Sequence, residues 1–240
     1  MSGTGSDPAG SPAWMREPAA ERYHLRTAVA TPASRAMAPA ATRTMRPARG
    51  AEFPDLADVL VRAFWMDPFH RWLFPDERVR PRRQRLLFER VLAIYGRHGV
   101  VYTTDDCSGV ALWDPPRDGG PSLPELVSFV VRVLPVFGAR AFRIAQGMAP
   151  MATLHPEEPH WYLSILGTDP ECQRSGVGSA LLNPVLRCCD EEGTSAYLEA
   201  SRIENVPYYE RFGFEVVAPL AMPAGGPVVY RMRRAARGRS

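Results

Sequence analysis

Residues 163–182 read LSILGTDPECQRSGVGSALL, and this stretch joins an apolar run typical of a strand to an apolar run with helical spacing. Between the two runs lie Pro170 and a polar turn that contains Gly176 and Gly178. Glycines let a backbone approach a ligand closely, and the first turn of a helix carries a partial positive charge. The stretch therefore predicts an anion-binding turn, with phosphate or pyrophosphate as its natural ligand. Arg174 can add a charge-assisted hydrogen bond at the edge of the turn.

Two kinds of nucleotide-binding loop can be compared with this turn. A Walker loop requires Gly-Lys followed by Ser or Thr, and the chain contains no lysine. A dinucleotide-binding fingerprint requires Gly-x-Gly-x-x-Gly directly after a strand, with an acidic residue about 20 positions later. Gly176, Gly178 and Glu199 fit parts of that fingerprint, but Leu181 stands in place of the third glycine. The turn is therefore not a Walker loop, and it fits a dinucleotide-binding loop only in part.

The rest of the chain predicts one mixed α/β domain (α+β type) over residues 41–235. Alternating and β-rich runs predict strands at 41–48, 100–104, 109–116, 160–168, 195–201, 214–217 and 227–234. Helical spacing predicts helices at 51–68, 77–99, 176–193 and 205–213, with two further helical pieces between 122 and 151. Residues 121–155 thus form a helical insert before the strand at 160–168.

The two ends of the chain differ from this domain in composition. Residues 1–40 are rich in Ala and Pro and show no hydrophobic periodicity, so we expect a disordered tail. Residues 236–240 form a short basic tail.

Composition narrows the classes of function. The chain has 240 residues, 45% of them hydrophobic, and a formal net charge of +3, which is too weakly basic to indicate a nucleic-acid partner. The longest apolar stretch, 126–142, is interrupted by Arg132, Pro135 and Arg140, so we expect no membrane span. The four cysteines show neither the spacing of a zinc site nor that of a disulfide framework. We expect a cytoplasmic protein without a metal.

The turn and its context resemble a known family. The segment from Gln173 to Gly178, QRSGVG, fits the Gln/Arg-x-x-Gly-x-Gly/Ala loop of the GNAT superfamily of N-acetyltransferases. Downstream, NVPYYERFGFEVV carries the second signature of that superfamily, running from Asn205 through Tyr209 to Gly213 and Phe214. Several stretches, including 155–182 and 197–216, resemble the puromycin N-acetyltransferases in particular.

This resemblance implies a fold and a mode of cofactor binding. The implied fold is a central twisted, mostly antiparallel sheet of about six to seven strands flanked by helices. The strand ending at Leu166, Gly167 and Thr168 is expected to splay from its parallel neighbour and to pair with the pantetheine arm of acetyl-CoA, the implied co-substrate. Asn205 is expected to hydrogen-bond the cofactor arm or, alternatively, to cap the short helix that follows it. Backbone amides of the turn would hold the pyrophosphate, and the residues concerned are Gln173, Arg174, Ser175, Gly176, Val177, Gly178 and Ser179.

Two residues are implied in catalysis. Tyr209 matches the tyrosine of the superfamily that acts as general acid, and a phenol with a pKa of about 10 can protonate the departing thiolate. Glu199 matches a strand glutamate of the puromycin enzymes and is the candidate base that deprotonates the amine. A structural pairing of Glu199 with Arg202 or Arg211 is the alternative, and His160 is the alternative base.

The sequence therefore predicts direct acetyl transfer to the primary amine of a small molecule, with an aminonucleoside-like antibiotic as one candidate acceptor. The insert at 121–155 would shape the acceptor pocket. We expect a monomer or a homodimer, with no nucleic-acid or membrane partner. Two other functions stay open: a non-catalytic acyl-CoA sensor and a protein or peptide N-acetyltransferase.

Overall fold

The computed structural model describes residues 43–98, 101–116, 123–142, 144–146, 154–223 and 225–238. The tail predicted at 1–40, the start of the helix predicted near Ser122 and the end predicted near Met151 lie outside these residues. Every strand predicted from the sequence is present in the described part of the chain.

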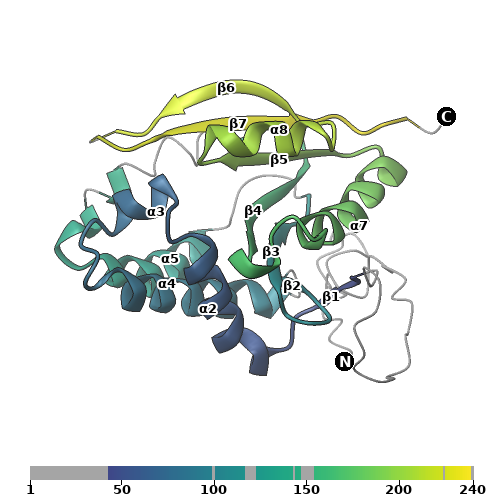
Figure 1. The fold of residues 1–240 in the computed structure, drawn as a ribbon. Helices are drawn as coiled ribbons and strands as arrows, with labels where there is room; N and C mark the ends of the chain where they lie inside the picture. Colours follow the sequence, from purple (N-terminus) through teal and green to yellow (C-terminus); the bar gives the residue numbers. More distant parts are fainter. Residues whose placement is uncertain are drawn as a thin grey trace, which may run out of the picture.

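Seven strands form one sheet in the order β1-β2-β3-β4-β5-β7-β6 (Figure 1). All neighbouring strands are antiparallel except β4 and β5, which are parallel. This confirms the mixed α/β class and the mostly antiparallel sheet. The strands are β1 (Met45–Pro47), β2 (Val101–Thr104), β3 (Gly109–Asp114), β4 (His160–Thr168), β5 (Ser195–Ala200), β6 (Glu215–Ala221) and β7 (Val228–Arg234).

The parallel pair separates part-way along its length. Pairing between β4 and β5 runs only from His160 opposite Ser195 to Leu163 opposite Leu198. From Ser164 to Thr168, β4 continues against β3 on its other side. Among the described residues, this last part of β4 has no strand partner on the β5 side, so its backbone groups there are available to a ligand.

Helices cover both faces of the sheet. One face is covered by α7 (Val177–Glu192), whose Leu181, Leu182 and Val185 are buried against β3, β4 and β5. The other face is covered by α2 (Phe53–Ala63) and α4 (Arg80–Tyr95), which pack on each other and, through α2, on β3 and β4. Figure 1 shows α2, α4 and α5 gathered on the opposite side of the strands from α7.

The remaining helices are short or belong to the insert. The insert contains α5 (Leu123–Val133) and the 3-10 segment η4 (Leu134–Arg140), which pack against α4, so a helical insert before β4 is confirmed. The short elements are η2 (Gly50–Glu52), α3 (Pro68–Leu73), η3 (Gly96–His98), η5 (Pro170–Cys172), η6 (Ile203–Asn205) and α8 (Val206–Glu210).

Candidate active site

The glycine turn ends at a helix whose N-terminus has no side-chain cap. Gly176 is the N-cap residue of α7 and adopts a left-handed conformation with φ of 88°, and no side chain bonds to the first turn. The first backbone hydrogen bond of the helix runs from the amide of Ala180 to the carbonyl of Gly176. The amides that precede Ala180 therefore have no partner within the helix. This arrangement suits an anion that accepts several N–H groups at once.

The predicted turn residues differ in what they offer to such an anion. Four of them, from Gln173 to Gly176, are exposed, and Arg174 adopts an unusual φ of 62°. Val177 is buried in the core, so only its backbone faces the turn. A Cβ on Gly178 would collide with the hydroxyl of Tyr208. An alanine at 178 would therefore have to displace the Tyr208 hydroxyl.

An arginine from the start of the described chain braces the turn. Nη1 of Arg43 donates to both the carbonyl and the Oγ of Ser175, at 2.8 Å each. Nε of Arg43 donates to Asp106 at 3.0 Å, and Asp106 in turn accepts from Thr104 and Ser108. Sequence reasoning missed Arg43 because no spacing rule connects the residue before β1 with a turn more than a hundred positions later.

The splayed end of β4 lies between α2 and the turn. Leu166 packs partly into the α7 side of the core, and the carbonyl of Thr168 accepts from Nε2 of Gln173 at 3.5 Å. Gly167 is buried, and a Cβ there would lie 2.6 Å from Cδ2 of Leu60 on α2. The missing side chain at Gly167 thus makes room for α2. Pairing of a ligand with the edge of this strand toward β5 stays a prediction.

Two tyrosines of α8 have different surroundings. Tyr208 points its hydroxyl at the first turn of α7, next to Gly178 and Ser179. Tyr209 is buried against Phe214, and burial raises the pKa of its phenol above the ordinary value, with smaller contributions from Tyr208 and Asp67. Tyr209 therefore keeps its proton at neutral pH, and burial makes its phenol a weaker acid than that of an exposed tyrosine.

Asn205 is exposed at the N-cap position of α8, and its side chain makes no capping hydrogen bond. Asn205 is therefore the N-cap residue of α8, as the alternative had it, but its side chain does not form the capping hydrogen bond. Its contact with a cofactor arm stays a prediction.

Glu199 lies where β4 and β5 separate. It is the residue after Leu198, the last residue of β5 that pairs with β4. Its side chain is only 5% exposed, and Arg231 of β7 stands directly opposite it in the sheet. Burial, the largest effect, raises the pKa of the carboxyl from 4.5 to about 7, although Tyr162, Tyr197 and Arg231 favour the charged form. Such a pKa suits a general base that works near neutral pH.

The two arginines considered as structural partners of Glu199 are engaged elsewhere. Arg202 pairs with Glu204 at 3.4 Å, and Arg211 lies over the ring of Tyr208. Glu199 instead interacts with the hydroxyls of Tyr162 and Tyr197. Nε2 of His155 also lies 3.5 Å from its Oε1. Sequence reasoning considered His160 but missed His155. Strand alternation places Tyr162 and Glu199 on one face, but the register that brings His155 to them cannot be derived from spacing.

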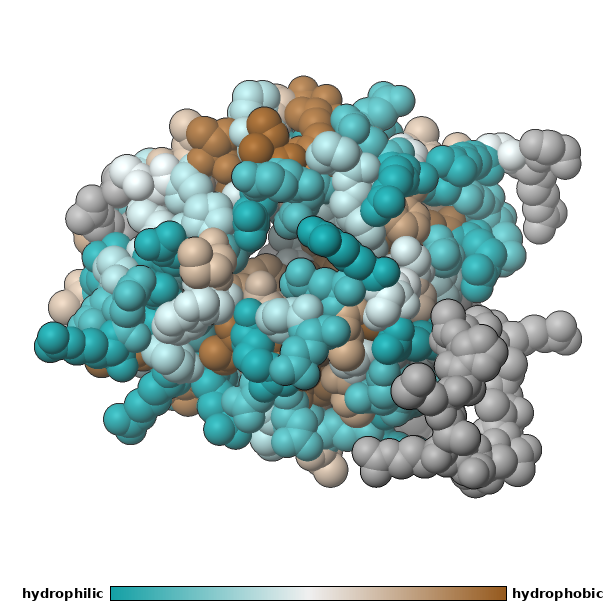
Figure 2. All heavy atoms as spheres, in the orientation of Figure 1, coloured by the Kyte–Doolittle hydropathy of each residue, from teal (hydrophilic) through white to brown (hydrophobic). Residues whose placement is uncertain are grey.

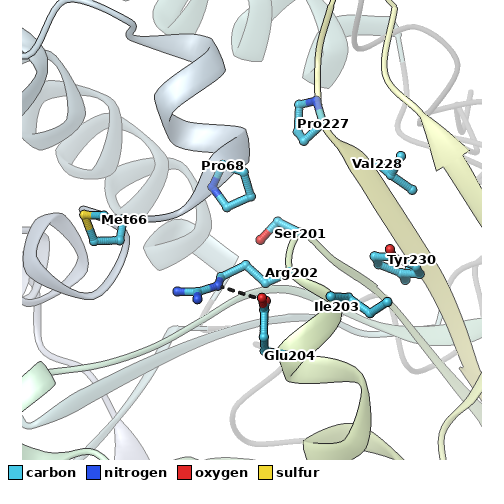
Figure 3. A pocket seen from close by; sticks show the side chains of 9 residues that line it. All are labelled: Met66, Pro68, Ser201, Arg202, Ile203, Glu204, Pro227, Val228 and Tyr230. Atoms are coloured by element: carbon cyan, nitrogen blue, oxygen red, sulfur yellow. Dashed lines mark hydrogen bonds and ion pairs between the residues drawn. The ribbon is translucent and has the colours of Figure 1, made fainter.

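A cavity of about 370 Å³ opens beyond the end of β5. Figure 3 shows Met66 and Pro68 on one side of it and Pro227, Val228 and Tyr230 on the other. Its floor is formed by the segment after β5, from Ser201 to Glu204. Ser201 donates a hydrogen bond to Asp67, the N-cap residue of α3, which holds α3 beside this floor.

Exposed apolar side chains also occur on strands β6 and β7. Val228 is 42% exposed, and Val217 on the neighbouring strand β6 is 56% exposed. Figure 2 shows an apolar group at the top of the molecule, where β6 lies in Figure 1. The cavity therefore has one apolar rim and one polar floor.

Within the described residues, no group of three or more His, Cys, Asp or Glu side chains is arranged to hold a metal ion. None of the helices in the described ranges combines the length and apolarity needed to span a bilayer.

Comparison with known proteins identifies the family. The model of the acetyltransferase (GNAT) family matches residues 64–214. This chain belongs to the GNAT family of acetyltransferases. The matched range contains the splayed strand, the glycine turn and both tyrosines of α8.

Relatives of this GNAT protein agree with that assignment. An uncharacterized N-acetyltransferase of Schizosaccharomyces pombe is 28% identical over 177 residues, which cover 68% of this chain and 70% of that protein. A Corynebacterium glutamicum structure described as histone acetyltransferase HPA2 and related acetyltransferase is 31% identical, with a TM-score of 0.60, and the match covers 81% of this chain and 97% of that one. Arylalkylamine N-acetyltransferase 2 of Aedes aegypti shares the fold at 11% identity, with a TM-score of 0.55 and coverage of 81% and 99%. The closer likeness to puromycin N-acetyltransferase stays a prediction.

Proposed function

We propose that this GNAT protein transfers the acetyl group of acetyl-CoA directly to the primary amine of a small molecule. The observation that carries the proposal is the separation of β4 from β5 after Leu163, which leads from a buried carboxylate to an uncapped helix N-terminus. A chain-like thioester with an anionic end matches both features. Its arm can pair with the free edge of β4, and its pyrophosphate can accept the amides at the start of α7.

The residues of the turn fit this co-substrate. The space at Gly176 is open, Gly178 makes room for the Tyr208 hydroxyl beside the first turn of α7, and Arg43 fixes the backbone at Ser175. Arg174 is exposed at the edge of the turn and supplies positive charge there. Asn205 follows β5, across the gap from the free edge of β4, and its side-chain amide makes no capping hydrogen bond. In this proposal that amide bonds to the cofactor arm.

Two side chains carry the proton transfers. Glu199 takes a proton from the substrate ammonium, because an amine must be neutral to attack the thioester carbonyl. The C–N bond then forms and the C–S bond breaks. Tyr209 donates its phenolic proton to the departing thiolate and regains one from solvent. The raised pKa of Glu199, about 7, leaves a large fraction of this base ionised at neutral pH while keeping it basic enough to accept a proton.

The cavity beyond β5 is our candidate acceptor pocket. Its volume of about 370 Å³ lies within the range of sites for small molecules, about 300–1,000 Å³. Its apolar rim and polar floor suit an amine with an apolar body, and an aminonucleoside-like antibiotic is one candidate. Among the described residues, none of the insert lines this cavity; Arg140 of the insert donates to the carbonyl of Trp72 in α3, so in this proposal the insert acts on the pocket through α3.

Direct transfer requires that no cysteine carry the acetyl group. Burial raises the pKa values of the Cys188 and Cys189 thiols to about 12, so neither is a thiolate at neutral pH. Cys172 is the cysteine in the turn itself, and it is half-buried. The variant Cys172→Ser therefore distinguishes direct transfer from an acetyl-cysteine intermediate.

The test is thiol release from acetyl-CoA with a panel of amines that includes puromycin, simple arylalkylamines and a lysine-containing peptide. We expect turnover of at least one small amine, retention of activity in Cys172→Ser and its loss in Tyr209→Phe. Turnover of the peptide alone would move the function to protein acetylation. Thermal stabilisation by acetyl-CoA without turnover of any amine would indicate a sensor.

A further inference from the structure

His155 is the side chain through which the buried Glu199 reaches the surface. Nε2 of His155 lies 3.5 Å from Oε1 of Glu199, and that oxygen has no hydrogen-bond partner among the described residues. The side chain of Glu199 is 5% exposed, whereas that of His155 is 28% exposed. The imidazole therefore touches both the enclosed carboxylate and solvent.

The ring of His155 is held in place by aromatic neighbours. It makes an edge contact with Tyr162 of β4, with 4.5 Å between ring centroids, and lies 5.1 Å from the ring of Tyr197 of β5. His160 follows at 5.7 Å, with its Nδ1 against the carbonyl of Glu158. These contacts orient one edge of the His155 imidazole toward Glu199.

The titratable groups around Glu199 leave His155 as the group able to accept its proton. Tyr162 and Tyr197 are phenols whose pKa values burial raises, so they hold their protons. Arg231, opposite Glu199 on β7, carries a guanidinium, which offers hydrogen-bond donors and no acceptor. Tyr95 of α4 and Asp114 of β3 bond to each other farther along the same face. Burial, followed by repulsion from His160, lowers the pKa of His155 to about 4, so its imidazole is neutral at pH 7. Transfer from Glu199, whose pKa is about 7, is therefore uphill, and the imidazolium is a short-lived carrier that must pass its proton to water at once.

We propose that His155 is the proton relay of Glu199, which it connects to solvent after each turnover. The inference rests on the proposed role of Glu199 as base. Glu199 receives the ammonium proton, and its carboxylic acid passes that proton to Nε2 of His155. The imidazolium releases a proton to water from Nδ1, which restores the carboxylate of Glu199. Exchange with water then returns the neutral ring to the tautomer with an unprotonated Nε2.

The first test needs no amine substrate. Long-range proton–nitrogen NMR of histidine-labelled protein reports the tautomer of His155 and the titration of its neighbours. We expect Nε2 to be unprotonated, with an inflection of the His155 shifts near pH 7 that disappears in Glu199→Gln. Shifts of His155 that pass through pH 7 without an inflection, or that keep it in Glu199→Gln, would overturn the proposal.

The second test is kinetic and uses puromycin or whichever amine the panel identifies. In dilute buffer, His155→Ala is expected to lower kcat about tenfold, to leave KM for acetyl-CoA unchanged and to increase the solvent deuterium isotope effect. Added imidazole should restore the rate in proportion to its concentration. A loss of kcat that no buffer base restores would assign His155 a packing role and contradict the relay.

Controls separate this inference from the proposed function. Glu157 is an exposed carboxylate close to His155 in the chain, and Glu157→Gln should keep the rate and the isotope effect of the natural protein. Full activity in Glu199→Gln would refute the base and, with it, the relay. If Glu199→Gln loses activity but His155→Ala keeps the kcat and the isotope effect of the natural protein, the relay alone is refuted.

Discussion

Replacing Glu199 by glutamine should stabilise the protein at alkaline pH while it removes activity. Burial disfavours the ionised carboxylate and raises its pKa from 4.5 to about 7. Glutamine resembles the protonated acid in shape and charge, so it avoids the burial of a negative charge. A residue that serves function at the expense of stability should give a more stable but inactive protein when it is replaced.

The magnitude and the sign follow from linkage. The folded-state pKa of Glu199 lies above its ordinary value, so the stability associated with its neutral form is complete below pH 4.5 and is lost as the pH rises through 7. A change in pKa from 4.5 to about 7 corresponds to about 3 kcal/mol of unfolding free energy, at about 1.36 kcal/mol for each tenfold change in proton affinity. The unfolding free energy of Glu199→Gln should therefore equal that of the natural protein near pH 4.5. At pH 8 it should be larger by up to about 3 kcal/mol.

Urea unfolding of both proteins across pH 4.5–8 measures this difference. Groups that titrate alike in both proteins cancel when the two unfolding free energies are subtracted. Glu157→Gln, at an exposed carboxylate, should show no such gain at pH 8. A Glu199→Gln protein that is less stable than the natural one at every pH would refute the reasoning, because it would make the charged carboxylate a structural support.

Three further substitutions test separate parts of the site. Tyr209→Phe should lower kcat about 100-fold with acetyl-CoA affinity unchanged, since it removes one general acid; equal kcat values in steady-state assays would exclude that role. Gly178→Ala should raise KM for acetyl-CoA at least about tenfold, because its methyl group displaces the Tyr208 hydroxyl from the first turn of α7. Calorimetric titration with coenzyme A checks this, and an unchanged affinity would place the ligand elsewhere. Arg43→Ala should raise the same KM several-fold with kcat unchanged, because Ser175 loses its brace; a fall in kcat alone would contradict that assignment.

Much of the fold could be predicted from local pattern. The aromatic run HWYLSILGT forms β4 with the predicted bounds, and the apolar spacing after Gly176 forms α7. The strand predicted at 214–217 is longer in the structure, Glu215–Ala221, because pairing with β7 extends it past the apolar residues. Alternation and helical spacing determine such elements because they reflect which side chains each element buries.

The site could be predicted only where a motif is continuous in sequence. The turn from Gln173 to Ser179 is continuous and is placed at a helix N-terminus, as the resemblance implied. The contacts of Arg43 with Ser175 and of His155 with Glu199 depend on strand register and on packing of segments distant in sequence. Register is decided by the whole sheet, so local spacing does not contain it. The burial that raises the pKa of Glu199 is likewise a property of the assembled sheet.

Hydrogen–deuterium exchange with and without acetyl-CoA tests the central claim most directly. The account predicts that the ligand slows exchange at the unpaired edge of β4, residues 164–168, and at the first-turn amides of α7, residues 177–179. Slowed exchange at both segments, reduced in Gly178→Ala, would place acetyl-CoA in the splay between β4 and β5. Protection confined to other elements, or no protection at saturating acetyl-CoA, would contradict the account.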